Sequence, residues 1–209
     1  MLQQSYQGKV LLIRFKTSKI SMSKLLICVL VLVTGVAPAP VRQNFHDESE
    51  AGINKQINME LYASYVYMSM ASYFGRDDVS LDGFARFFRR MSEEERQQAN
   101  VLVDYQNKRG GRAVYQDLQK PQQAQWNDGL DAMQAALELE KNQNQELLDL
   151  YKIADQHGDP QMQDFLNYHF LKEEVTRIKQ LGDYVTKLKR VGSGLGEYIF
   201  DRDTLGGGK

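Results

Sequence analysis

Four glutamates occupy positions where a helical pattern calls for apolar side chains. In segment 81–105, apolar residues recur at alternating steps of four and three, as one face of a helix requires, and Glu95 falls on that stripe. Glu60, Glu140 and Glu174 interrupt three other stripes in the same way. A buried carboxylate is costly unless it is paired or binds a metal ion. The spacing therefore indicates a carboxylate site inside a helical bundle.

Four carboxylates that meet inside a bundle would repel one another, and several would bind protons. Two divalent cations would neutralise the cluster, and a carboxylate-rich site with few nitrogen ligands suits iron or manganese better than zinc or copper. Gln98 follows Glu95 on its stripe, and Glu94 is near enough to assist. Tyr67 shares a face with Glu60, where its hydroxyl can hydrogen-bond a ligand carboxylate from a neighbouring helix.

A single glutamate on such a stripe is more often a boundary residue whose carboxylate reaches water. Four of them in register make that interpretation weak. The three histidines, His46, His157 and His169, lie off the carboxylate stripes, and we expect loop or surface roles for them.

Four long helices must position these side chains. Glu60 and Glu95 are 35 residues apart, and Glu140 and Glu174 are 34 apart, as expected for two helical hairpins with their carboxylates at one level. The segment 112–125, with Pro121 inside it, predicts a long crossover between the hairpins.

Helix ends are marked by local signals. Asn44 or Asp47 is suited to cap the first helix, the third begins near Asn127 or Asp128, and Pro160 suits the first turn of the fourth. A short apolar segment, LGEYIF, predicts a small fifth helix near the C-terminus. The predicted fold is all-α, a four-helix bundle with one long crossover.

Composition excludes several classes of protein. The 209 residues are 42% hydrophobic and 25% charged, which is typical of a soluble protein. A formal net charge of −1 argues against nucleic-acid binding, which normally needs a basic excess. The one cysteine, Cys28, excludes an intrachain disulfide framework.

The N-terminal segment differs from the rest of the chain. Lys24 is followed by LLICVLVLV and then TGVAPAP, a basic start, an apolar stretch and small residues, as in a secretory signal peptide. We therefore expect an N-terminal extension and signal peptide over 1–39, with Met22 as an alternative initiator, and a four-helix, two-metal domain over 40–209. This predicts a secreted or vesicular protein without a membrane segment after leader removal. The alternative is an apolar tail on a cytoplasmic protein.

From about Val41 to Leu205 the chain resembles animal ferritins of the heavy-chain type. The motifs that carry the resemblance are RQNFHDESEAGINKQINMELYASYVYMSM, the EEER of Glu93 to Arg96, NKRGGR, LELEKNQNQ, GDPQMQDF and EYIFDRDTLG. The resemblance implies a ferritin-like bundle and a shell of twenty-four subunits, made of one chain type or several. Such a shell takes up ferrous iron, oxidises it with dioxygen and stores it as a ferric mineral.

The resemblance also implies roles for single residues. Glu60 matches a ligand of the first iron, Glu95 the bridging glutamate and Glu140 a ligand of the second iron, with Tyr67 as its hydrogen-bonding tyrosine. Two irons per subunit and a ferroxidase activity follow from that match.

Two positions of the site depart from the heavy-chain pattern. The ligand histidine three residues after the bridging glutamate is Gln98, and the usual glutamine of the fourth helix is Glu174. In the channel through which iron enters, Asp164 is kept but Asn167 replaces a glutamate, which weakens the electrostatic funnel. We therefore expect slower oxidation than in a standard heavy chain.

Three hypotheses remain at this point. The first is an iron-storage ferritin with a modified ferroxidase centre, and the second is a catalytically poor structural and storage subunit that needs a more active partner chain. The third, a four-helix signalling bundle, would use two long crossovers and would need no buried carboxylates.

Overall fold

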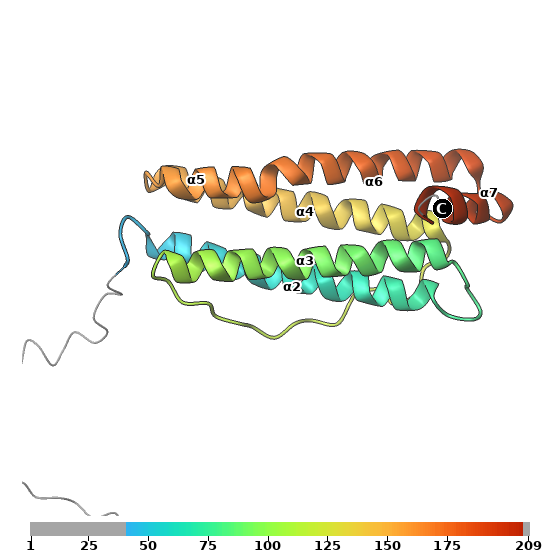
Figure 1. The fold of residues 1–209 in the computed structure, drawn as a ribbon, viewed down its shortest axis with the longest axis horizontal. Helices are drawn as coiled ribbons and strands as arrows, with labels where there is room; N and C mark the ends of the chain where they lie inside the picture. Colours follow the sequence, from blue (N-terminus) through green and yellow to red (C-terminus); the bar gives the residue numbers. More distant parts are fainter. Residues whose placement is uncertain (1–40, 207–209) are drawn as a thin grey trace, which may run out of the picture. The chain divides into compact units, whose positions relative to one another are not determined.

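The computed structural model describes residues 41–206, and the predicted leader over 1–39 lies outside them. Four long helical segments lie side by side, with a short helical segment at one end (Figure 1). The elements are α2 (Asp47–Phe74), α3 (Asp82–Lys108), α4 (Gly129–Gln156), α5 (Pro160–Leu166), the π-helix η1 (Asn167–Leu171), α6 (Lys172–Val191), α7 (Leu195–Ile199) and the π-helix η2 (Phe200–Leu205). This arrangement confirms the predicted all-α bundle with a short C-terminal helix. None of the helices in this part of the chain is long and apolar enough to cross a membrane.

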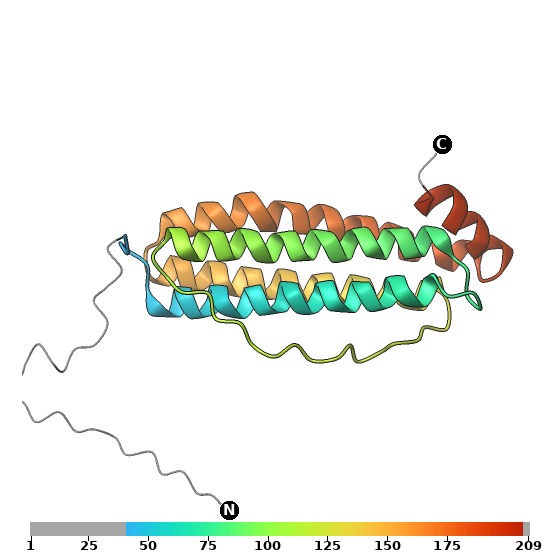
Figure 2. The same ribbon diagram turned by 60° about the horizontal axis from the view of Figure 1, so that its bottom comes forward.

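The connection between α3 and α4 runs back along the length of the bundle (Figure 2). It is tied to α2 near its start, where Asn54 Nδ2 donates to the Arg112 carbonyl at 3.0 Å and the Val114 amide donates to Asn54 Oδ1 at 2.9 Å. Near its end, Trp126 is buried and its carbonyl accepts from the Tyr73 hydroxyl at 2.5 Å. These contacts hold the crossover on the surface, so that α4 starts at the same end of the bundle as α3.

Most of the predicted helix ends are correct, and one is not. Asp128 caps α4 by accepting from the Asp131 amide at 2.8 Å, and Pro160 lies in the first turn of α5. The cap of α2, however, is His46, whose Nδ1 accepts from the Glu48 amide at 3.2 Å. Asn44 instead donates through its side chain to the Gly158 carbonyl at 3.0 Å, and its backbone is in the left-handed region, with φ 47°, whereas a cap residue is usually extended.

The fourth long helix is not a continuous α-helix, which the sequence analysis missed. The π-helix η1 interrupts it between α5 and α6. Three residues spaced four apart are buried there: Leu166, Phe170 and Glu174. A turn of π-helix holds more residues than a turn of α-helix, and this wider turn keeps Glu174 on the buried face.

Candidate metal centre

The buried glutamates separate two apolar clusters of the bundle. On α2, Ile57 belongs to one cluster and Tyr67 to the other, with Glu60 between them. On α3, Glu95 lies between Met91 and Leu102 in the same way. The same holds for Glu140 on α4 and Glu174 on α6, and all four glutamates have 0% exposed surface. The predicted glutamates therefore lie in one polar layer across the middle of the bundle.

Two amides hold the half of this layer that α2 contributes. Gln56 Nε2 donates to Glu60 Oε1 at 2.7 Å, one turn away on the same helix. Gln143 Nε2 donates to Glu60 Oε2 at 2.6 Å and to Glu95 Oε2 at 2.8 Å, and so joins α2, α3 and α4. These bonds fix the orientation of both carboxylates.

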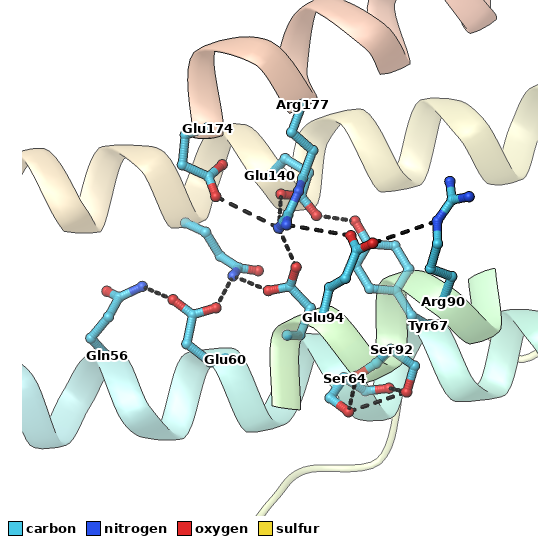
Figure 3. A network of polar contacts seen from close by, with 12 residues as sticks. Gln56, Glu60, Ser64, Tyr67, Arg90, Ser92, Glu94, Glu140, Glu174 and Arg177 are labelled. Atoms are coloured by element: carbon cyan, nitrogen blue, oxygen red, sulfur yellow. Dashed lines mark hydrogen bonds and ion pairs between the residues drawn. The ribbon is translucent and has the colours of Figure 1, made fainter. Parts of the chain in front are cut away.

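The other half of the layer contains a phenol and a guanidinium. The Tyr67 hydroxyl donates to Glu140 Oε1, a bond between α2 and α4 of the kind that the sequence suggested. Arg177 Nη1 donates to Glu95 Oε1 and lies 3.3 Å from Glu140 Oε2 and 3.7 Å from Glu174 Oε1 (Figure 3). A cation of the protein itself therefore contacts three of the four carboxylates.

Several buried oxygens of the layer have no hydrogen-bond donor among residues 41–206. They are both oxygens of Glu174 and the side-chain carbonyl oxygens of Gln98 and Gln143. Buried polar atoms normally find a partner, and oxygens without one are what a bound cation would satisfy. The donor set, carboxylate and amide oxygens without sulfur, fits a hard cation such as ferrous iron.

Burial and mutual repulsion shift the protonation of these groups. Burial, followed by the charge of Glu140, raises the pKa of Glu174 to about 9. Burial also raises the pKa of Glu95 well above its ordinary range, and the charges of Glu60 and Glu140 raise it further. Burial raises the pKa of Glu140, although Arg177 and the Tyr67 hydroxyl act against it. A metal-free cluster therefore holds protons at neutral pH, which bound cations would displace.

Glu94 and Gln98 lie on the side of the layer that faces a groove between α3 and α6. Gln98 is buried, whereas the Glu94 side chain is 40% exposed and pairs with Arg90 at 3.5 Å. The groove has a volume of about 810 Å³, and both residues line it together with Arg177. Glu94 is thus placed beside the buried layer, 3.6 Å from Arg177 Nη2.

Three residues of the layer, Gln56, Gln143 and Arg177, were missed by the sequence analysis. Gln56 is 2% exposed and Gln143 is 1% exposed. A signal was present, because Gln143 and Arg177 each follow a buried glutamate by three residues, as Gln98 follows Glu95. A polar side chain one turn beyond a buried carboxylate lies on the same face of the helix.

The predicted channel residues lie apart from this layer. Asp164 lies within α5 and Asn167 begins η1, and both are exposed. A separate group of possible metal ligands joins the start of α2 to the end of α4. There the His46 and His157 rings stack at 3.6 Å, and Glu48 Oε2 lies 2.7 Å from His157 Nε2. The ligand atoms of these three residues lie within 4.8 Å of one another, so they could hold a second kind of ion.

A bundle with one crossover and a carboxylate layer at its centre defines the class of ferritin-like carboxylate proteins. Residues 50–191 match the family described as the ferritin-like domain. The chain is 65% identical over 164 residues to soma ferritin of Lymnaea stagnalis. That match covers 78% of this chain and 94% of the relative. The chain is 58% identical over 166 residues to ferritin-1 heavy chain of Schistosoma mansoni, 79% of this chain and 96% of the relative. The chain belongs to the ferritin family and is an iron-storage subunit of a multi-subunit shell.

Proposed function

We propose that the buried carboxylate layer is the place where this subunit binds ferrous iron and oxidises it. Glu60, Glu95, Glu140 and Glu174 would supply the carboxylate ligands for two ferrous ions, with Glu95 between them. The observation that carries this proposal is the meeting of four fully buried carboxylates from four helices, some of whose oxygens lack donors. Ferrous iron at such a site would give electrons to dioxygen, and the ferric product would pass to the mineral.

The neighbours of the carboxylates support this assignment through their own chemistry. Gln143 holds Glu60 and Glu95 in fixed orientations, and Tyr67 does the same for Glu140. Burial, with the charges of Glu140 and Glu95, raises the pKa of Tyr67 well above its usual range, so the phenol keeps its proton and remains a donor. Ligands that other side chains hold in place bind metal more tightly than free ones.

The assembled shell provides the test. Glu140→Gln keeps the size of the side chain but removes its charge, and we expect the initial rate of aerobic ferrous iron oxidation to fall at least about tenfold. Glu138→Gln is the matched control, because Glu138 is exposed on the same helix and pairs with Lys141 at 2.7 Å. Equal rates in the parent protein and Glu140→Gln would show that the site is assigned wrongly.

A second candidate function is supported by Gln98 and Arg177. An amide at Gln98 is a weaker ligand than an imidazole, and Arg177 already neutralises part of the cluster. Both features favour a catalytically poor subunit that stores iron and co-assembles with a more active ferritin chain. Gln98→His decides between the two: a large gain in oxidation rate supports the poor subunit, and an unchanged rate rejects it.

The proposal extends to assembly and location. We infer a shell of twenty-four subunits, of one chain type or of mixed chains, with Asp164 and Asn167 lining the channels through which iron enters. The apolar segment after Lys24 supports a secreted or vesicular protein. Measuring the mass of the native particle and sequencing its N-terminus would test both inferences on one sample.

A further inference from the structure

The Arg177 guanidinium lies beside three of the four buried carboxylates of the layer. Its Nη1 atom lies within 3.7 Å of Glu174 and within 3.3 Å of Glu140, and it donates to Glu95. These three carboxylates come from α6, α4 and α3. One positively charged nitrogen among carboxylates of three helices occupies the kind of position that a bound cation takes.

The burial of Arg177 adds to this observation. Its side chain is 11% exposed, and the three carboxylates that it contacts are 0% exposed. Burial opposes the charge of Arg177, but Glu95, Glu140 and Glu174 outweigh that effect and raise its pKa. The guanidinium is therefore a permanent charge inside the bundle, and its attraction to the carboxylates is little screened by water.

The groove between α3 and α6 offers the Arg177 guanidinium an alternative position. Arg177 lines this groove of about 810 Å³ together with Glu94 and Gln98. Glu94 Oε2 already lies 3.6 Å from Nη2 and is 40% exposed, so it offers a partner nearer to water. An arginine side chain has enough rotatable bonds to reach either the buried or the partly exposed carboxylates without movement of α6.

We propose that Arg177 is a resident cation of the carboxylate layer that competes with divalent metal ions and turns towards Glu94 in the groove when two of them bind. This inference rests on the proposed function, because it takes the layer as the metal site. Without metal, Arg177 neutralises carboxylates that would otherwise repel one another. With metal, its charge would lie too close to a second cation to remain in place.

Binding of Co²⁺, which has a visible absorption that reports its ligands, tests the proposal without iron oxidation. Assembled, metal-free shells of the parent and of Arg177→Ala are titrated with Co²⁺, and Glu140→Gln identifies the part of the signal that belongs to the layer. We expect Arg177→Ala to bind Co²⁺ in the layer at least about tenfold more tightly. Arg177→Lys, which keeps a charge, should stay nearer to the parent.

Lys172→Ala is the matched control, since Lys172 lines the same groove and is exposed but has no ion pair within residues 41–206. It should leave Co²⁺ binding unchanged. Thermal unfolding gives an independent measurement: Arg177→Ala should unfold at a lower temperature than the parent without metal and gain more from Co²⁺. Arg177→Gln replaces Arg177→Ala if the alanine variant does not assemble.

The results distinguish the role of Arg177 from the existence of the metal site. Equal Co²⁺ affinity in the parent and in Arg177→Ala, with a signal that Glu140→Gln abolishes, would overturn the role of Arg177 and leave the metal site intact. A Co²⁺ signal that Glu140→Gln does not change would overturn the metal site, and the role of Arg177 with it.

Discussion

Three of the four buried carboxylates of the layer have a polar neighbour that limits their movement. Gln143 links Glu60 to Glu95, and Tyr67 holds Glu140. Glu174 differs, because its oxygens have no hydrogen-bond donor among the described residues and its nearest cation, Arg177, is 3.7 Å away. Glu174 is therefore the carboxylate most dependent on a bound cation.

Tyr67→Phe removes a single buried hydroxyl and leaves the acceptor Glu140 without that bond. We expect the free energy of unfolding of the metal-free subunit to fall by about 1–3 kcal/mol, and iron oxidation to slow. Tyr73→Phe is the control, because the Tyr73 hydroxyl bonds to the crossover at Trp126, away from the layer. It should lower stability without slowing oxidation. Equal oxidation rates in Tyr67→Phe and the parent would contradict the role given to Tyr67.

Glu174 predicts a pH dependence for the metal-free subunit. Its pKa is about 9 in the folded state, against an ordinary value of 4.5, so between these values the folded state binds more protons than the unfolded chain. The free energy of unfolding should therefore fall as pH rises from 4.5 towards about 9. Glu174→Gln should flatten this fall, as measured by denaturant unfolding across the range. Glu173 is an exposed neighbour, so the free energy of unfolding of Glu173→Gln should depend on pH as in the parent. The prediction is contradicted if this free energy falls as steeply with pH in Glu174→Gln as in the parent.

At the residue scale the sequence predicted the four carboxylates and the Tyr67 hydroxyl beside them, but not the contacts of Gln56, Gln143 and Arg177. Each glutamate interrupts an apolar stripe, so periodicity alone finds it. Gln143 and Arg177 lie beside the stripes, in stretches rich in charged and amide side chains, where periodicity does not distinguish a buried polar residue from a solvated one. Their position one turn beyond a glutamate was a usable signal, but the direction of the Arg177 side chain is set by packing.

The helices position the layer because each hairpin places two glutamates at one level. The prediction of four long helices and a crossover succeeded because the stripes are long and the turns are marked by glycine and proline. The π-helix η1 could not be predicted from these signals, since it depends on where the wider turn fits between α5 and α6. The cap of α2 was missed because His46 is a rare capping residue.

The C-terminal segment contributes to the stability of α3. Asp201 Oδ1 accepts from the Phe84 amide at 2.8 Å, and so satisfies a donor in the first turn of α3. Asp201→Ala should lower the free energy of unfolding by about 1 kcal/mol, as for the loss of a helix cap. Asp203→Ala is the control, because Asp203 is exposed and pairs with Arg202 at 2.7 Å. Denaturant unfolding that does not distinguish the two variants would refute the capping role.

At the scale of the whole molecule, Asp164 and Asn167 are the residues that we propose to line the channels through which iron enters. If Asp164 and Asn167 line the route of iron, Asn167→Glu should restore negative charge there and raise the rate of iron uptake at low salt. The gain should shrink at high salt, because salt screens exposed charges. Asn142→Glu, an exposed substitution on α4, adds the same charge elsewhere and should have little effect. A gain that does not depend on salt would argue against electrostatic attraction.

We propose that the buried layer binds two ferrous ions in each subunit. Crystals of the assembled protein, soaked briefly with ferrous iron without oxygen, give the most direct test through anomalous diffraction at the iron edge. We expect two iron peaks among Glu60, Glu95, Glu140 and Glu174, both absent in Glu140→Gln or much weakened. Iron peaks only on the shell surface or in its channels, with none inside the bundle, would contradict the claim.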